Sequence, residues 1–322
     1  MFLPLGTLRS ILDLRNFIDR AKSSMISIAF VLIVLYFSRL TLPLSNLHNS
    51  MPTKSSIINL LNEKIDCLPD QQIFTQIPAK SSITTILTEN VDCLLLDCDG
   101  TIAETEKDMT LLQFNEAFKR KGLGHIQWDP LLYGELLKTG VSQYRFKSYF
   151  DSVGYPEYVI DKALFCQEMK QLKDDMFDYI WENNPLPPRP GILKLVDLAL
   201  SLHIPIVVCS NSNYYPVNKI CTTLFGPERM KYIRVIGGDN PNIKRKKPFP
   251  DIYNLALLLT SQEKGHNYDP SRCLVIEDSE VGLQAALAAN MKCIVTPSYY
   301  TTLESFTGAY MVLPTLDSLF TS

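Results

Sequence analysis

Short apolar runs alternate with longer amphipathic segments over much of this 322-residue chain. Runs with the length and composition of buried strands lie at 91–96, 204–209, 233–236, 273–276, 293–296 and 311–313. The segments between the later runs start near residues 191, 216, 251 and 281, and their apolar side chains recur at helical spacing. This alternation predicts an α/β fold in which helices cover both faces of a parallel, Rossmann-like sheet.

The pattern between the first two runs is helical throughout, over residues 104–185. Apolar side chains recur there every three or four residues, and a proline-rich stretch at 185–191 ends the segment. A helical segment inserted after the first strand would cover the carboxyl edge of the sheet. We therefore expect an inserted α-helical cap at 104–185 and a core that comprises residues 91–103 and 186–322.

The N-terminal part of the chain has a different pattern. Residues 25–37 form a nearly apolar run behind basic side chains, and residues 38–62 contain no Asp or Glu. The run has the length of a signal-peptide core, and the acid-poor tract resembles a transit peptide. We therefore expect a two-part leader over residues 1–50 that directs the protein through the secretory system into an organelle, namely a plastid. The alternative is a signal anchor in the secretory system, in which residues 25–37 stay uncleaved and provide the membrane contact.

A partial duplication lies in residues 51–90, which we expect to be a linker. The pattern of residues 54–68 recurs 26 positions later, at 80–94, where it leads into the first strand-like run. Two copies are too few for a repeat protein. We interpret the duplication as a truncated copy of the opening segment of the core or as an error in the gene model, with no function of its own.

Composition narrows the classes of function. The chain is 46% hydrophobic with a formal net charge of −3, which suits one or two globular domains and argues against a nucleic-acid partner. None of its eight cysteines forms a Cys-x-x-Cys pair. Buried, reduced thiols are therefore expected rather than a disulfide framework or a metal site. We expect the protein to be a monomer.

Polar side chains follow four of the strand-like runs, at the points where the strands would end. They are Asp97 and Asp99 after the first run, Ser210 and Asn211 after the second, Lys247 in the loop after the third, and Glu277 and Asp278 after the fourth. Because the carboxyl ends of parallel strands meet at one edge of a sheet, we expect these residues to share one site. Ser210 and the amide of Asn211 can hydrogen-bond a phosphate group there.

The acidic residues of this set suit phosphoryl transfer with Mg²⁺. Asp97 and Asp278, with Glu277 and the backbone carbonyl of Asp99, can supply the oxygen ligands that Mg²⁺ prefers. Transfer of a phosphoryl group to an aspartate needs such a cation to offset the repulsion between carboxylate and phosphate. Lys247 can neutralise Asp97 and the transferring oxygens. The residues therefore predict an enzyme that uses Mg²⁺ and acts on phosphorylated molecules.

These motifs resemble those of the haloacid dehalogenase superfamily. The matching segments are Asp97-Cys98-Asp99-Gly100-Thr101, Ser210, Lys247-Pro248-x-Pro250-Asp251 and Glu277-Asp278-Ser279-x-x-Gly282. Residues 100–106, 189–191 and 296–301 further resemble the CbbY-like phosphatases, which hydrolyse xylulose 1,5-bisphosphate. The inserted segment is similar to the cap of the β-phosphoglucomutase-like branch. The resemblance implies a haloacid dehalogenase core with an inserted helical cap.

The resemblance also implies roles for the strand-end residues. Asp97 is implied to be the nucleophile and Asp99 the general acid and base, with Lys247 balancing charge. Asp97, the carbonyl of Asp99 and Asp278 are implied to bind Mg²⁺, with Glu277 close by. The implied activity is hydrolysis of a small sugar phosphate through an aspartyl-phosphate intermediate.

Substrate choice is expected to depend on the cap side of the site. Glu104 and Arg145 are expected to contact substrate, and Arg145 is the obvious cation of the cap. Where the family shows a His-Arg pair and a Lys, this chain has Thr110, Leu111 and Gln143. The lost donors should weaken the hold on a second phosphate group, so we expect broader use of sugar monophosphates.

Two other functions remain open at this stage. A phosphomutase of the same fold would return the phosphoryl group to a rearranged sugar, and the cap sequence does not exclude it. A catalytically silent, membrane-anchored binding module is the other alternative. The presence of Asp97, Asp99, Lys247 and Asp278 together argues against the silent module.

Overall fold

The structure is a computed structural model, and it describes residues 83–320. The expected leader, the possible anchor at 25–37 and the first copy of the duplication lie outside the described residues. None of the helices between residues 83 and 320 is long and apolar enough to cross a membrane.

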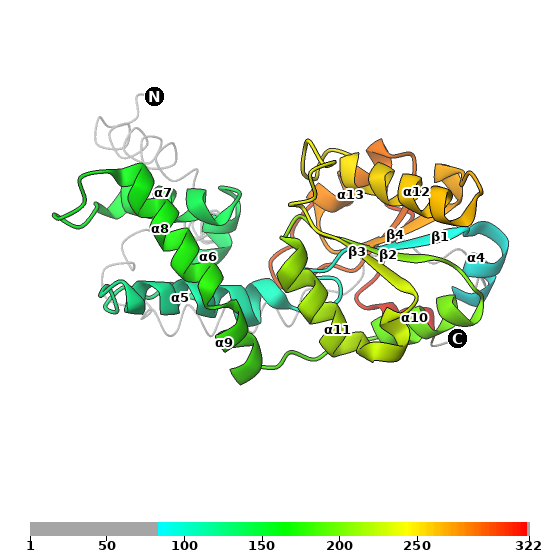
Figure 1. The fold of residues 1–322 in the computed structure, drawn as a ribbon, viewed down its shortest axis with the longest axis horizontal. Coiled ribbons are helices and arrows are strands. Elements are labelled where there is room, and N and C mark those ends of the chain that lie inside the picture. Colours follow the sequence, from blue (N-terminus) through cyan, green and yellow to red (C-terminus); the bar gives the residue numbers. More distant parts are fainter. Residues whose placement is uncertain (1–82, 321–322) are drawn as a thin grey trace, which may run out of the picture. The chain divides into compact units, whose positions relative to one another are not determined.

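Six parallel strands form one sheet in the order β3-β2-β1-β4-β5-β6. In Figure 1 the sheet, with β1 to β4 labelled, lies between the helices of the core. They are β1 (Cys93–Leu96), β2 (Ile206–Cys209), β3 (Ile233–Ile236), β4 (Cys273–Glu277), β5 (Lys292–Val295) and β6 (Met311–Val312). The predicted parallel sheet is therefore confirmed. β2 starts two residues later than predicted, directly after Pro205, which has no backbone N–H to donate to a neighbouring strand.

Helices cover both faces of the sheet. They are α4 (Ile83–Asn90), α10 (Ile192–Ser201), α11 (Tyr214–Met230), α12 (Asp251–Lys264) and α13 (Glu280–Ala288), with short 3₁₀ helices η3 (Pro270–Arg272) and η4 (Leu316–Leu319). Side chains alternate along β1, so Leu94 and Leu96 pack with α4, α10 and α11, whereas Cys93 and Leu95 pack with α12 and α13. The sheet thus separates two apolar clusters and holds the strand ends rigidly.

The last residues of the expected linker at 51–90 form helix α4 instead. Ile83, Ile86 and Leu87 are buried in the same apolar cluster as β1 and α10. Since burial of large aliphatic side chains stabilises a fold, residues 83–90 belong to the core. The predicted linker therefore ends too late.

The segment inserted between β1 and α10 is helical, as its spacing predicts. It contains the π-helix η2 (Glu106–Thr110), α5 (Leu111–Arg120), α6 (Pro130–Leu137), α7 (Ser142–Val153), α8 (Lys162–Asp175) and α9 (Phe177–Asn183). Its buried aromatic cluster is separate from the two clusters at the sheet, and Phe114 lies at its centre with ring centroids of Trp128 and Phe146 at 4.8 and 4.7 Å. Asp129 and Asp161 cap the N-termini of α6 and α8 through their side chains.

Candidate active site

The ends of β1, β2 and β4 bring the predicted polar residues together. Leu96 of β1 pairs with Val208 of β2 and Ile276 of β4, so the residues that follow these strands emerge side by side. The backbone N–H of Asp97 donates to the carbonyl of Ile276 at 3.0 Å, which continues the pairing past the end of β1. The topology of the sheet, rather than proximity in sequence, therefore assembles the site.

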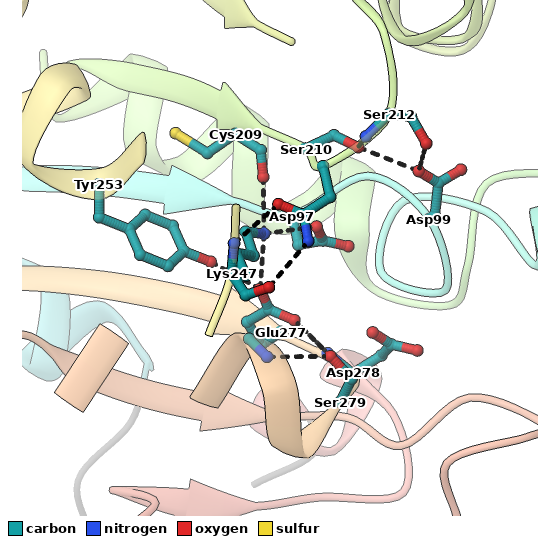
Figure 2. A network of polar contacts seen from close by, with 12 residues as sticks. Asp97, Asp99, Cys209, Ser210, Ser212, Lys247, Tyr253, Glu277, Asp278 and Ser279 are labelled. Carbon is teal, nitrogen blue, oxygen red and sulfur yellow. Dashed lines mark hydrogen bonds and ion pairs between the residues drawn. The ribbon is translucent and has the colours of Figure 1, made fainter. Parts of the chain in front are cut away.

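Lys247 lies at the centre of this network, between Asp97 and Glu277 (Figure 2). Its Nζ donates to Asp97 Oδ1 at 2.6 Å, to Glu277 Oε1 at 2.7 Å and to the carbonyl of Cys209 at 2.8 Å. The Lys247 side chain is 3% exposed. Burial acts to lower the pKa of Lys247, but the carboxylates of Asp97 and Glu277 outweigh it and raise this pKa above its ordinary value. The lysine is therefore held charged against the end of β1.

Asn211 positions Lys247 through its backbone. The Asn211 side-chain oxygen accepts from the Lys247 N–H at 3.0 Å, and its amide nitrogen donates to the Lys247 carbonyl at 3.3 Å. Both polar groups of the side chain are thus engaged. A contact between Asn211 and phosphate would therefore have to come from its backbone amide.

Glu277 is enclosed by donors on both carboxylate oxygens. Oε1 accepts from Lys247 and from the Tyr253 hydroxyl at 2.6 Å, and Oε2 accepts from the Asp278 N–H at 3.2 Å and the Ser279 hydroxyl at 3.3 Å. Gly282 packs against this carboxylate so closely that an added Cβ would lie 1.9 Å from Glu277 Cδ. Tyr253 was not predicted from the sequence to belong to the site, although it lies only two residues after the motif that ends at Asp251.

Asp97, Glu277 and Asp278 form a buried group of carboxylates that can hold a metal ion. Their ligand atoms lie within 4.8 Å of one another. Burial, followed by the charge of Glu277, raises the pKa of Asp97 to about 8. Burial, followed by the charge of Asp97, raises the pKa of Asp278 above its ordinary value. Because oxygen donors at this density suit Mg²⁺, the residues fit the expected cation, and Asp97 and Asp278 are better placed as ligands than the fully enclosed Glu277.

Asp99 points away from Lys247 toward two serines that follow β2 (Figure 2). Its Oδ2 accepts from the hydroxyls of Ser210 at 3.0 Å and Ser212 at 2.7 Å, and its Oδ1 accepts from the hydroxyl of Thr105 at 2.7 Å. Ser210, which was expected to bind phosphate, therefore holds Asp99 in this structure. Ser212 and Thr105 were not assigned this role from sequence, because their approach to Asp99 depends on the shapes of two loops.

The two residues expected to contact substrate from the cap side are engaged in ion pairs. Arg145 donates to the hydroxyl of Tyr133 at 2.6 Å and forms an ion pair with Glu106 at 3.4 Å, and its side chain is 12% exposed. Glu104 forms an ion pair with Arg189 at 3.1 Å. The structure therefore places Arg145 in contacts within the cap rather than among the residues at the strand ends.

Two of the altered cap positions are also buried. Leu111 belongs to the aromatic cluster of the cap, and Thr110 lies in the preceding π-helix with 8% of its surface exposed. An arginine in place of Leu111 would enter an apolar environment. Gln143, at the start of α7, is partly exposed.

A family model for haloacid dehalogenase-like hydrolases matches residues 91–290, which include all of the strand-end residues above. Together with the parallel sheet and the buried carboxylates, this match defines the class of the protein as a haloacid dehalogenase-like hydrolase. The match covers more than half of the chain, and the chain belongs to the haloacid dehalogenase-like hydrolase family.

Within that family the chain is CbbY-like. It is 44% identical to a CBBY-like protein from Arabidopsis thaliana over 67% of this chain and 66% of the relative, so it spans just under two thirds of that protein. It is 33% identical to Protein CbbY from Cereibacter sphaeroides over 70% of this chain and 93% of the relative. A variant of CbbY from Rhodobacter sphaeroides, solved in complex with xylulose-(1,5)bisphosphate, has a similar structure with a TM-score of 0.59 and 30% identity, over 70% of this chain and 95% of that chain.

Proposed function

We propose that this protein is a magnesium-dependent phosphatase that hydrolyses a small sugar phosphate through an aspartyl-phosphate intermediate. The observation that carries the proposal is the buried network in which Lys247 joins Asp97, Glu277 and the carbonyl of Cys209 at the ends of three strands. A charged lysine beside an aspartate favours the ionised carboxylate, which is the form that attacks phosphorus.

The reaction proceeds in two steps. Asp97 attacks the phosphorus atom, the bond between phosphorus and the sugar oxygen breaks, and Asp99 protonates the departing oxygen. Asp99 then takes a proton from a water molecule, which attacks the aspartyl-phosphate and releases inorganic phosphate and Asp97. The three hydroxyls around Asp99 suit a carboxyl group that changes protonation, because a hydroxyl can rotate to donate or to accept.

Asp97 and Asp278, with the backbone carbonyl of Asp99, are the ligands that we propose for Mg²⁺. The cation would supply positive charge that offsets the repulsion between the Asp97 carboxylate and the phosphate. Glu277 supports the site without binding the cation. Its charge balances that of Lys247, and the four groups that donate to its carboxylate fix its position.

We propose a phosphorylated sugar as the substrate because the related CbbY structure contains a sugar bisphosphate. Arg145, which was the expected cation for a second phosphate, already pairs with Glu106 and Tyr133. We therefore propose that the protein hydrolyses sugar monophosphates as well as xylulose 1,5-bisphosphate. We also propose, separately, that it acts as a monomer. Gln143→Lys should raise kcat/KM for the bisphosphate more than for any monophosphate.

The test is a screen of the purified protein against sugar monophosphates and xylulose 1,5-bisphosphate, with magnesium and with a chelator in its place. We expect release of inorganic phosphate that depends on magnesium. Conversion of one sugar phosphate into another without net phosphate release would instead identify a mutase. No turnover of any compound, by a protein shown to be folded, would refute the proposal.

The location of the protein is a separate proposal. We propose import into a plastid, supported by the composition of residues 1–62 and by the similarity to a plant protein. A fluorescent fusion of residues 1–82 should accumulate in plastids, whereas a fusion of residues 83–322 should not. Uncleaved fusion protein in endomembranes would favour the anchor, and cytosolic fluorescence would contradict both hypotheses.

A further inference from the structure

Arg189 lies where the chain returns from the cap to the core. It precedes Pro190, Gly191 and helix α10, and its backbone N–H donates to the carbonyl of Ile102 at 2.8 Å. Ile102 belongs to the outgoing connection between β1 and the cap. The two connections between core and cap are therefore hydrogen-bonded to each other at this residue.

The Arg189 side chain reaches carbonyls of two further loops. Its Nη1 donates to the carbonyl of Gly100 and, at 2.7 Å, to that of Thr296, while its Nη2 donates to the carbonyl of Pro297 at 2.8 Å. Its Nε pairs with Glu104 at 3.1 Å, and the side chain is 10% exposed. A guanidinium group has five N–H donors in a planar fork, so it can serve several fixed acceptors at once, whereas a lysine ammonium cannot reproduce this geometry.

These acceptors belong to two loops: one carries the proposed catalytic carboxylates Asp97 and Asp99, and the other contacts the proposed metal ligand Asp278. The first is the β1 loop (residues 97–105), in which Gly100 packs so closely on Asp278 that an added Cβ would lie 2.1 Å from Asp278 Oδ2. The second is the β5 loop (residues 296–301), in which the hydroxyl of Thr301 donates to the carbonyl of Asp278 at 2.6 Å. Arg189 thus joins one loop that carries the proposed nucleophile to another that fixes Asp278.

Glu104 extends the same arrangement toward the cap. One oxygen of its carboxylate pairs with Arg189, and the other accepts from the backbone N–H of Tyr299 at 3.4 Å. Tyr299 lies in the β5 loop, and the ammonium group of Lys107, in the π-helix η2, is 4.6 Å from the centre of its ring. The Arg189 contacts therefore connect the strand-end site with the first helical turn of the cap.

We propose that Arg189 is a positioning residue for phosphoryl transfer, which fixes the β1 loop against the β5 loop and so sets the relative placement of Asp97, Asp99 and Asp278. This inference rests on the proposed function of the same site. Displacement of reacting groups by about 1 Å can reduce a rate by about 10²-fold, so loosening of either loop should be visible in kcat.

The test compares Arg189→Met and Arg189→Lys with the wild-type protein. Arg189→Met should lower kcat by about 10–100-fold with a smaller change in KM, because substrate contacts remain while the reacting groups lose their alignment. It should also raise the magnesium concentration needed for half-maximal activity and reduce the rise in melting temperature that magnesium alone produces. Arg189→Lys keeps the charge but not the planar fork, so it should recover less than the full kcat.

Arg229→Met is the matched control. Arg229 also pairs with an aspartate, Asp197 at 2.6 Å, and donates to a backbone carbonyl, that of Phe225 at 2.9 Å. The pair with Asp197 joins α11 to α10, the bond to Phe225 lies within α11, and neither contact involves the strand-end loops. Its substitution should leave kcat and the magnesium titration unchanged. A similar loss of kcat in this control would show that removing an arginine lowers activity by destabilising the whole protein, and it would overturn the inference.

The possible outcomes distinguish a failure of this inference from a failure of the proposed function. If Arg189→Met is folded and has wild-type kcat and a wild-type magnesium shift in melting temperature, the inference fails while the phosphatase proposal stands. If Arg189→Met does not fold, Arg189→Lys decides, and wild-type kcat in that variant overturns the inference. If the wild-type protein hydrolyses no sugar phosphate, the proposed function fails, and the magnesium shift alone then tests whether Arg189 organises the carboxylates.

Discussion

Replacement of Lys247 by methionine tests the network that carries the proposed function. The substitution keeps a long, unbranched side chain but removes the positive charge that lies 2.6 Å from Asp97 and 2.7 Å from Glu277. Because the lysine side chain is 3% exposed, water cannot replace it, and loss of one partner from a buried ion pair costs about 3–5 kcal/mol. We expect the free energy of unfolding, measured by denaturant titration, to fall by this amount.

The same variant should lose turnover. Burial and the charge of Glu277 raise the pKa of Asp97 to about 8, and Lys247 acts in the opposite direction. Without the lysine the pKa of Asp97 rises further, so a smaller fraction of the aspartate is ionised and able to attack phosphorus. Phosphate release from the sugar phosphate that the screen identifies measures this loss in the folded variant.

Lys219→Met provides a control, because Lys219 forms ion pairs at distances similar to those of Lys247 but is more exposed. Lys219 pairs with Asp178 at 2.6 Å and Glu182 at 3.1 Å, but its side chain is 28% exposed, so its loss should cost less than about 1 kcal/mol. Adding Glu277→Gln to Lys247→Met removes the uncompensated charge and should recover part of the stability, with a coupling of about 0.5–3 kcal/mol. Equal losses from the two lysines, or near-normal turnover by Lys247→Met, would refute the reasoning.

Three further substitutions test individual contacts at the site. Asp97→Asn should abolish turnover in a protein that still folds, because the amide is nearly isosteric but cannot attack phosphorus and Glu277 remains as a partner of Lys247. Normal phosphate release would remove Asp97 from the mechanism. Asp278→Asn should raise the magnesium concentration for half-maximal activity, and an unchanged titration would exclude it as a ligand. Gly282→Ala should lower the free energy of unfolding by about 1–3 kcal/mol, because its Cβ would lie 1.9 Å from Glu277 Cδ. An unchanged denaturation midpoint would contradict that close packing.

The sheet and the meeting of its strand ends could be predicted from sequence because both follow from short-range pattern and topology. Apolar runs bounded by polar residues define strands, and a parallel sheet places the ends of those strands at one edge. Helix α4 was missed because it is only eight residues long, and its burial depends on apolar side chains of α10 and the sheet that are distant in the sequence. The local sequence pattern contains no information about these distant packing partners.

The partners of the site residues could not be predicted in the same way. Arg145 has the charge of a phosphate ligand, but Glu106, 39 positions earlier in the chain, neutralises it inside the cap. Ser210 has the hydroxyl of a phosphate ligand, but it donates to Asp99. Sequence indicates which groups can bind or react, and the fold determines which of these groups already have a partner.

The pattern of contacts separates the proposed chemistry from substrate selection. At the strand ends Lys247 joins Asp97 to Glu277, and within the cap Arg145 contacts both Glu106 and Tyr133. The β5 loop (residues 296–301) contacts both groups, because Thr301 holds Asp278 while the ring of Tyr300 lies 5.6 Å from that of Tyr133 in the cap. We therefore expect substitutions inside the cap to change substrate preference without disturbing the carboxylates, whereas a change in the β5 loop should affect both binding and turnover.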